Sequence, residues 1–462
     1  MRPGRVACHS NLLFVVSRDP RSRSTSWRLT LASVSTVPPY QSPIAPGRSY
    51  YEDTVERPAY PPLEGALSVD VAIVGGGFTG LSAAVHLARS GASVVVLEAH
   101  RFGDGASGRN GGQMGTGQRL WPLELEAEYG PDKAKRLFKL GEEAKAHLFD
   151  FVEANGLDVD LGRGQLSIAH KARYLDEYQR TAEVLAERYD YPHARYMDAA
   201  ETAERVGSAR YFGGMRDTGT GHLNPMKLVV ATARLAAESG AALHEGTKVE
   251  RFEERGDRSV VVTERGEISA GHVLVATNAY GHDLAPAVDA HVMPIGSFIG
   301  ATEPLGDETV LPGGEACDDS RFVVRYFRKS ADNRLLFGGR EAYTSAAGDI
   351  TRHIRTQIAE VYPRLKDVRL THAWGGNVAI TMKRMPYVRR LSPTMTTIGG
   401  YSGHGVLLSN FAGRLFAERF AGNRDRLAEL EDLDIPAFPG GKRLRFPLMV
   451  LAMTYFSLRD RF

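Results

Sequence analysis

A glycine-rich turn between a buried strand and a helix constrains the fold of this chain more than any other feature. Residues 69–74 form an apolar run typical of a strand buried on both faces, and Gly75-Gly76-Gly77-Phe78-Thr79-Gly80 follows it directly. A helix is predicted over residues 81–89 and a second buried strand over residues 94–97. This order predicts a βαβ unit with a parallel pair of strands.

The turn matches the G-x-G-x-x-G fingerprint of dinucleotide-binding βαβ units. Gly75 allows the tight turn, Gly77 lets a pyrophosphate approach the backbone, and Gly80 lets the helix pack closely on the strand. Free N–H groups at the start of the helix then face the phosphates. Glu98 ends the second strand, 23 positions after Gly75, where a carboxylate can accept hydrogen bonds from ribose hydroxyls. The alternative is a plain glycine turn with a surface glutamate.

A second segment of small residues follows, Gly105-Ala106-Ser107-Gly108-Arg109-Asn110-Gly111-Gly112-Gln113. So many small side chains leave backbone N–H donors able to approach a bulky ligand. The alternative is a flexible loop. The fingerprint alone does not separate FAD from NAD, and this segment favours FAD.

The charge distribution argues against a nucleic-acid-binding protein. The net charge is +2, but residues 1–50 hold seven arginines and one acid, which gives +6 and leaves about −4 for the remaining chain. Such a body has no basic stripe to neutralise phosphates. The two cysteines, Cys8 and Cys317, are too few for a disulfide framework or a Cys-based metal site, so we predict no metal and a cytoplasmic location.

The two ends of the chain differ from the body. Residues 1–48 are rich in serine, arginine and proline, so we expect a disordered tail, either a targeting segment or the product of a misassigned start codon. The apolar run over residues 446–458 is shorter than the roughly 20 residues that span a bilayer. It predicts a buried terminal helix or an interface patch, and we expect no membrane span.

The remaining patterns predict two interleaved domains. Helices are expected over 131–153, 172–187 and 350–362, after Asp198, and from Asn224-Pro225. Strands are expected over 165–169, 242–244, 249–253, 259–263, 272–276, 292–302, 322–327 and 334–337. We predict an α/β protein with a nucleotide-binding domain in three pieces, 49–158, 215–288 and 370–462. An antiparallel-sheet substrate domain over 159–214 and 289–369 interrupts it.

Several motifs together resemble one family. They are the fingerprint with Glu98, the segment Ala106–Gln113, Ala276-Thr277-Asn278-Ala279-Tyr280 and Tyr401-Ser402-Gly403-His404-Gly405. The chain from about Ser49 onward resembles the D-amino-acid oxidase-like (DAO) superfamily of FAD-dependent oxidoreductases. Within it, Thr302-Glu303-Pro304-Leu305, Leu335–Gly339 and Trp374-Gly375-Gly376 are similar to the group of gamma-glutamylputrescine oxidoreductases.

The resemblance implies a Rossmann-type FAD-binding domain and a set of cofactor contacts. In it, Val249 contacts adenine through its backbone, and the start of the last long helix directs N–H groups at the flavin. The implied FAD-binding residues are Gly75, Gly77, Phe78, Thr79, Gly80, Glu98, Ser107, Arg109, Asn110, Gly111, Gly112, Gln113, Val249, Ala276, Thr277, Gly403, Gly405 and Val406.

Two departures from relatives matter. Relatives that attach the flavin covalently use a histidine in the small-residue loop or a cysteine near the C-terminal strand. This chain has Arg109 and Asn110 in the loop and no cysteine over residues 376–385, so FAD is predicted to be non-covalent. Met382-Lys383-Arg384 stands where many relatives carry an acid, which leaves the substrate contacts there open.

Three residues are candidates for the catalytic site. His404 lies between glycines and its imidazole titrates near neutrality, so we expect it beside the flavin, although it can equally hydrogen-bond a carbonyl. Trp374 and Tyr326 are expected to wall the substrate cavity, with core packing as the alternative. Arg325 and Arg328 can meet a substrate carboxylate, but a solvated strand face is the favoured interpretation.

The predicted function is oxidation of a C–N bond in a substituted polyamine, such as a gamma-glutamylated putrescine, as part of polyamine catabolism. The imine formed hydrolyses to an aldehyde, and O₂ or another acceptor reoxidises the flavin. One alternative is oxidation of an amino acid or N-methyl amino acid, such as glycine or sarcosine, by an oxidase or dehydrogenase. Another is a non-catalytic nucleotide-binding module. A monomer or small homo-oligomer is expected.

Overall fold

The computed structural model describes residues 13–18, 27–32, 40–342, 349–423, 425–441 and 447. The chain divides into two units, residues 1–40 and 41–462. In the first unit, β1 (Leu13–Arg18) pairs antiparallel with β2 (Trp27–Ala32). These two segments are rich in β-branched and aromatic residues, which explains why they differ from the disordered tail that we expected. Except for Pro447, the C-terminal helix expected over residues 446–458 lies outside the described residues.

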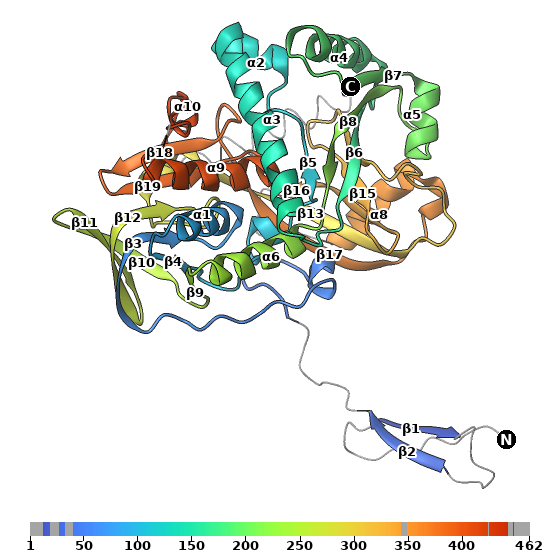
Figure 1. Cartoon of the computed structure of the whole chain (residues 1–462). Helices are drawn as coiled ribbons and strands as arrows, with labels where there is room; N and C mark the ends of the chain where they lie inside the picture. Colours follow the sequence, from blue (N-terminus) through green and yellow to red (C-terminus); the bar gives the residue numbers. More distant parts are fainter. Residues whose placement is uncertain are drawn as a thin grey trace. The chain divides into compact units, whose positions relative to one another are not determined.

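The fingerprint follows one strand of the first sheet of the second unit and leads into the helix after it (Figure 1). The main strand order of this sheet is β10-β11-β12-β3-β4-β9, and β19 pairs with β12 and β18. Strands β3, β4, β9, β12 and β19 run parallel, as the βαβ pattern predicts. The bounds are β3 Gly65–Val74, β4 Val94–Leu97, β9 Ala242–His244, β10 Val249–Arg255, β11 Arg258–Thr263, β12 Gly266–Val275, β18 Tyr387–Ser392 and β19 Met395–Gly399.

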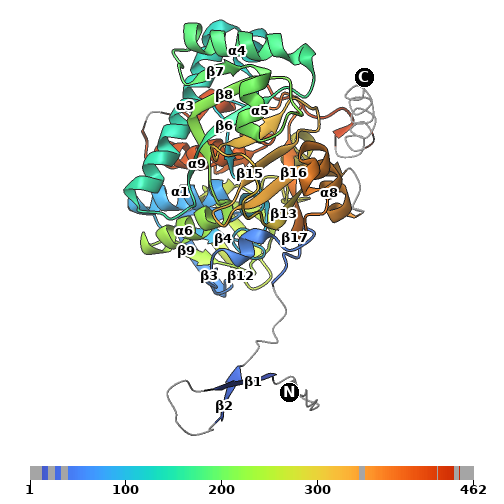
Figure 2. The same ribbon diagram turned by 90° about the vertical axis from the view of Figure 1, so that its right-hand side faces the viewer.

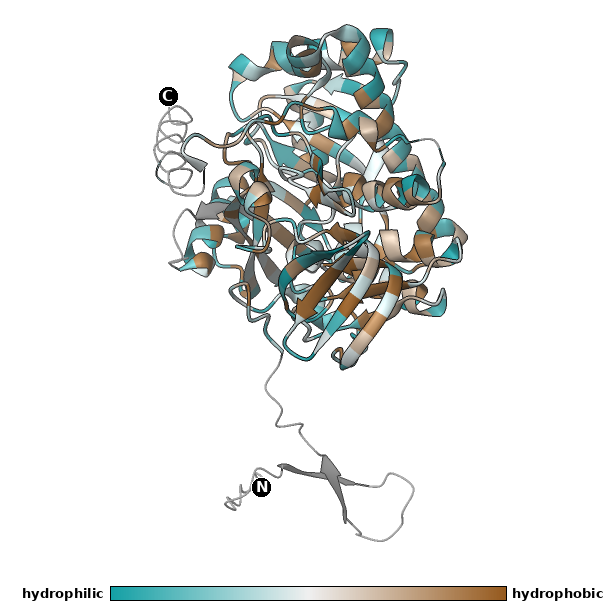
Figure 3. Ribbon diagram, turned by 90° about the vertical axis from the view of Figure 1, so that its left-hand side faces the viewer, coloured by the Kyte–Doolittle hydropathy of each residue, from teal (hydrophilic) through white to brown (hydrophobic). Residues whose placement is uncertain are grey.

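The parallel strands are apolar because helices cover them. Val71, Ile73, Val95 and Val96 are fully buried, and Figure 3 shows hydrophobic residues along strands of the molecule. Helix α1 (Phe78–Arg89) packs against α6 (Pro225–Glu238) and α9 (Gly405–Phe420), and α9 also packs against α3 (Pro131–Ala154). The crossing of α1 and α9 is close, because a Cβ on Gly413 would lie 2.4 Å from the carbonyl oxygen of Thr79.

The second sheet has the order β17-β13-β16-β15-β14-β6-β8-β5, and β7 pairs with β8 (Figure 2). All its pairs are antiparallel except β14 with β6. The bounds are β5 Gln113–Met114, β6 Gly162–Ile168, β7 Ala194–Met197, β8 Gly214–His222, β13 Met293–Pro304, β14 Ala316–Asp319, β15 Tyr326–Lys329, β16 Arg334–Ala342 and β17 Leu370–Ile380.

Further helices flank this sheet. Helix α8 packs against β13, β16 and β17, while α4 packs against β7 and β8. The bounds are α2 Pro122–Tyr129, α4 Leu175–Arg188, α5 Ala199–Val206, α7 Pro286–His291, α8 Ile350–Val361 and α10 Ala428–Glu431. The α/β fold class, with a Rossmann-type domain and a second domain built on an antiparallel sheet, is confirmed.

Three details differ from the sequence expectations. Strands β8 and β17 belong to the second sheet. The domain boundaries expected at 215 and 370 therefore lie too early, and by sheet membership they fall after His222 and Ile380. The glycines and polar residues of β8 and β17 hid the strand pattern. The strand expected over 322–327 is β15, which begins at Tyr326, because Asp319 accepts the N–H groups of Arg321 and Arg325 and holds the preceding residues in a turn.

Candidate active site

One cavity of about 1170 Å³ extends from the fingerprint to the face of the second sheet. Its lining includes residues 77–79, the small-residue segment, the inner face of the second sheet and residues 401–406. Small-molecule sites are usually about 300–1,000 Å³. The cavity therefore has room for a dinucleotide and a substrate together.

The fingerprint glycines have the conformations that the motif requires. Gly75 has φ +107°, which favours glycine, and a Cβ on Gly80 would lie 2.1 Å from the Gly75 carbonyl oxygen. Gly77 lines the cavity at the N-terminus of α1. Ser107 caps this end, since its hydroxyl accepts the N–H of Phe78 at 2.9 Å. The arrangement fits the pyrophosphate of a dinucleotide.

Glu98 lies at the end of β4, beside the turn. Its carboxylate accepts the N–H groups of Gly76 at 2.9 Å and His100 at 3.1 Å. Burial raises the pKa of Glu98, and these hydrogen bonds partly oppose the rise. Each carboxylate oxygen has a second lone pair for a ribose hydroxyl. Of the predicted FAD-binding residues, Gly75, Gly80, Glu98, Val249 and Thr277 are not in the cavity lining, and the others are.

Side chains behind the small-residue segment hold its carbonyl groups. Trp374 Nε1 donates to the Arg109 carbonyl at 3.0 Å, the Tyr51 hydroxyl to Asn110 at 3.0 Å, and Arg328 Nε to Gly111 at 2.6 Å. In a trans peptide the next N–H points opposite to the carbonyl. The N–H group of Asn110 is therefore directed away from Trp374, and that of Gly111 away from Tyr51. We call residues 106–113 the loop wall of the cavity.

The guanidinium of Arg109 is bound on the outer side of the loop wall. It donates to the carbonyl groups of Gly375 at 2.6 Å and of Pro46 and Gly47 at 2.8 Å each. Pro46 and Gly47, which hold it, precede the expected domain boundary at 49.

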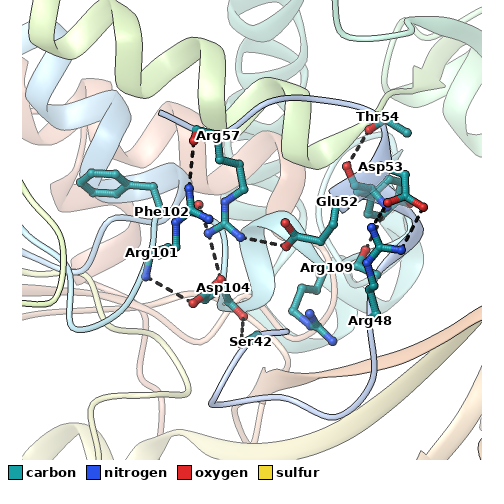
Figure 4. Close-up of polar contacts among 12 residues, drawn as sticks. Ser42, Arg48, Glu52, Asp53, Thr54, Arg57, Arg101, Phe102, Asp104 and Arg109 are labelled. Carbon is teal, nitrogen blue, oxygen red and sulfur yellow. Dashed lines mark hydrogen bonds and ion pairs between the residues drawn. The ribbon is translucent and has the colours of Figure 1, made fainter. Parts of the chain in front are cut away.

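Buried ion pairs fix this N-terminal segment (Figure 4). Arg57 lies between Glu52, at 2.8 Å, and Asp104, at 2.9 Å, and the three side chains are at most 7% exposed. Ser42 also donates to the Asp104 carbonyl, at 3.2 Å. Removing one partner of a buried pair typically costs about 3–5 kcal/mol, so the segment is a firm support for the loop wall.

The structure places three of these residues differently from the favoured expectations: Trp374 outside the cavity lining, and Arg325 and Arg328 away from solvent. Trp374 does not line the cavity, because it is fully buried against Tyr51, with ring centroids 5.4 Å apart. Its indole N–H donates to the Arg109 carbonyl from behind the loop wall. Arg325 and Arg328 are neither cavity residues nor solvated. Arg325 pairs with Glu360, whereas Arg328, 3% exposed, also binds the Leu223 carbonyl at 2.8 Å.

His404 lines the cavity at the N-terminus of α9, as predicted. Its ring lies against Gly115, where a Cβ would be 2.3 Å from Cε1. Burial, reinforced by the charge of Arg119, lowers the pKa of His404 from 6.5 to about 4. The imidazole is therefore neutral at neutral pH instead of titrating there. Its Nε2 has no hydrogen-bond partner among the described residues.

The opposite side of the cavity is made by side chains of the second sheet. Asp318 pairs with Tyr326 on β15 and with Ser167 on β6, and paired residues project to the same face. Gln165 and Ser167 both hydrogen-bond Asp318, and the Tyr326 hydroxyl lies 3.1 Å from Ser297. We call Gln165, Ser167, Asp318 and Tyr326 the sheet wall.

Tyr326 was predicted to wall the cavity, and it does, whereas Asp318 and Arg119 were missed. Burial raises the pKa of Asp318 to about 6, although its hydrogen bonds lower it. No motif marks either residue, and only strand register reveals Asp318. Among the described residues, no cluster of three metal-ligating side chains occurs, and no helix is long and apolar enough to cross a bilayer.

Comparisons with known proteins agree with this geometry. The DAO family model, FAD dependent oxidoreductase, matches residues 70–419. The chain is 55% identical to the probable oxidoreductase OrdL of Rhizobium meliloti (strain 1021), over 92% of this chain and 100% of that protein. It is 35% identical to the gamma-glutamylputrescine oxidoreductase of Escherichia coli (strain K12), over 89% of this chain and 98% of that protein.

Solved structures share the fold. Glycine oxidase from Geobacillus kaustophilus superposes with a TM-score of 0.68 at 22% identity, over 79% of this chain and 98% of that one. The chain belongs to the DAO family of FAD-dependent oxidoreductases. It is an FAD-dependent enzyme that oxidises amines or amino acids. The prediction of an oxidoreductase is confirmed, and the non-catalytic alternative is set aside.

Proposed function

We propose that this enzyme oxidises the terminal C–N bond of a gamma-glutamylated polyamine, such as gamma-glutamylputrescine. The observation that carries the proposal is 35% identity to a gamma-glutamylputrescine oxidoreductase over nearly the full length of that relative. The volume of the cavity supports it, because a substrate longer than glycine needs space beyond the cofactor. The domain boundaries, the cytoplasmic location and a monomeric or small oligomeric state remain parts of this proposal.

We infer that FAD is bound non-covalently. Among the described residues that line the cavity, none is a cysteine. Cys317 is fully buried in the apolar cluster behind the second sheet, and burial raises the pKa of its thiol well above the usual range, which makes the thiolate scarce. Acid precipitation of the protein is expected to release all of the flavin into the supernatant.

The chain's own residues would hold the cofactor at two places. The turn at Gly77 and Ser107 would receive the pyrophosphate, and the N–H groups of the loop wall and of α9 would meet the flavin ring. When bound, FAD supplies the acceptor for the two electrons and the hydrogen of the substrate C–H bond.

The side chains around the substrate have simple roles in this proposal. The reacting amine must be neutral, so that its lone pair is free, and the enclosed cavity favours that form by excluding water. His404 is neutral and has an unpartnered ring nitrogen, so it can exchange a hydrogen bond with the reacting centre. The Tyr326 ring packs on Gly111 of the loop wall, where a Cβ would lie 2.9 Å from it, and its cavity-facing side can border the carbon chain. The imine product reacts with water to give an aldehyde and ammonia.

Oxidation of a small amino acid is the second candidate. A glycine oxidase from Geobacillus kaustophilus (strain HTA426) is 27% identical over 76% of this chain. An arginine that faces the flavin would favour such a substrate, and Arg119 lines the cavity.

Anaerobic reduction of the purified yellow protein separates the two candidates. Gamma-glutamylputrescine is expected to bleach the flavin absorbance at low concentration, and glycine and sarcosine are not. Bleaching by glycine or sarcosine alone would overturn the proposed substrate. Reoxidation by air or by an artificial acceptor then distinguishes an oxidase from a dehydrogenase.

A further inference from the structure

Two side chains of opposite charge, Arg119 and Asp318, line the cavity without forming an ion pair. Arg119, in the loop between β5 and α2, lines the cavity and has no hydrogen-bond or ion-pair partner among the described residues. Asp318, on β14, lines the same cavity, and its hydrogen-bond donors Gln165 and Ser167 are both neutral. The guanidinium is near enough to lower the pKa of the Asp318 carboxyl, yet the two side chains form no direct ion pair.

Most other charged residues of the cavity are engaged, and the exception, Glu177, lies near Glu124, whose charge and the burial of the site raise the pKa of the Glu177 carboxyl. Arg321 pairs with Asp319, and the Arg384 guanidinium lies 5.3 Å from the centre of the Phe322 ring. Asp217 accepts hydrogen bonds from Thr116 at 2.6 Å and Tyr191 at 2.7 Å. Arg119 and Asp318 are therefore the pair most available to a ligand. Within the described part of the chain, Arg119 has no partner and Asp318 has only neutral ones, so a ligand with a carboxylate and an ammonium group would add a charge-assisted hydrogen bond to each.

We propose that Arg119 and Asp318 bind the α-carboxylate and α-ammonium groups of an amino-acid end of the substrate, and that a different amine of the same molecule is oxidised. The inference rests on the proposed function and specifies its substrate class: an alkylamine linked to an amino acid through its side chain. Arginine matches a carboxylate with two parallel hydrogen bonds, and Asp318 offers oxygen acceptors to an ammonium group.

The charge of Asp318 decides which amine reacts. A carboxylate next to an amine favours the protonated form, whose nitrogen has no free lone pair. An ammonium group bound at Asp318 is thus protected from oxidation, and the reacting amine lies elsewhere on the molecule. Glycine and sarcosine have a single nitrogen, so this site disfavours both as substrates.

Binding without turnover is the direct test. N-butyl-γ-glutamide carries the amino-acid end and lacks the terminal amine, so its binding to the FAD-loaded protein can be measured by calorimetry. Arg119→Gln and Asp318→Asn are each expected to weaken binding about 10- to 100-fold, because each removes a charge-assisted hydrogen bond. Arg119→Lys, which keeps the charge, is expected to lose less. Arg369→Gln and Asp434→Asn remove exposed charges outside the cavity and serve as controls.

Reduction kinetics separate this inference from the proposed function. For gamma-glutamylputrescine, both cavity variants are expected to raise the apparent Kd about 10- to 100-fold, with the limiting rate of flavin reduction within about threefold. For N-acetylputrescine, which lacks the amino-acid end, the Kd is expected to stay within about twofold. If gamma-glutamylputrescine still reduces the flavin of both cavity variants with unchanged Kd values, the inference is overturned but the proposed function is not. Failure of the wild type to bind N-butyl-γ-glutamide would also overturn it, and failure of every gamma-glutamyl amine to bleach the flavin would overturn the proposed function.

Discussion

The two walls of the cavity are built on opposite principles. The loop wall presents backbone N–H groups, and side chains from other segments hold its carbonyl groups from behind. The sheet wall presents side chains, and strand register brings them to one face. The residues of the first wall are consecutive in the sequence, although distant side chains support them, while the second wall brings together residues as distant as Gln165 and Asp318. The loop wall suits a cofactor common to a family, and the sheet wall suits a substrate that varies within it.

Gly112→Ala is expected to have the largest effect, because it attacks the backbone of the loop wall. Gly112 has φ +75°, and a Cβ there would lie 1.9 Å from the Leu223 carbonyl oxygen. We expect a loss of about 3–5 kcal/mol in the free energy of unfolding and weak flavin binding. Gly91→Ala is the matched control: φ is +89° but nothing lies within 4 Å, so a loss of about 1–2 kcal/mol is expected. Equal losses, measured by denaturant unfolding, would show that the close approach does not matter.

Arg328→Met tests the support behind the loop wall. The guanidinium is buried and binds the carbonyl groups of Gly111 and Leu223, which the variant leaves without that donor. A loss of about 3 kcal/mol in stability is expected, together with a shifted flavin absorbance spectrum. Arg369→Met, at a 70% exposed side chain, is expected to change stability by at most about 0.5 kcal/mol. A normal flavin spectrum in a destabilised Arg328→Met protein would limit the role of Arg328 to folding.

His404 lies against the backbone just beyond the loop wall, and its low pKa predicts a pH dependence of stability. The pKa is about 4 in the folded protein against 6.5 for an ordinary histidine. The unfolded chain therefore binds a proton that the native protein does not, and stability falls as the pH drops from 6.5 toward 4. At pH 5 this loss is about 2 kcal/mol, and His404→Gln is expected to abolish that part. The free energy of unfolding of the wild type and of His404→Gln, each with saturating FAD, is measured at pH 7 and pH 5. An equal loss between the two pH values in both proteins would contradict this prediction.

The same contrast explains how much of the molecule could be predicted from the sequence. The fingerprint glycines lie within six residues of one another between two apolar runs, so this local pattern predicted the βαβ unit of β3, α1 and β4. Trp374 was misassigned because a tryptophan on a strand looks the same whether it faces a cavity or the back of a loop. Asp318 was missed because its position is defined by pairing with β6, which lies about 150 residues earlier in the chain.

Tyr326→Phe tests the sheet wall with the smallest change. The variant removes the hydroxyl 3.1 Å from Ser297 and keeps the ring against Gly111. We expect the hydroxyl, which lines the cavity, to hydrogen-bond the substrate as well; because one hydrogen bond is worth about 1 kcal/mol, its loss is expected to slow flavin reduction by gamma-glutamylputrescine about fivefold, with little change in stability. Tyr362→Phe removes a hydroxyl that donates to the Val206 carbonyl at 2.9 Å in the core, so it is expected to lower stability by about 1 kcal/mol and leave the rate unchanged. If the two variants instead behave alike, the hydroxyl of Tyr326 stabilises the fold only, and the substrate is oriented by the ring and by the charged groups around it.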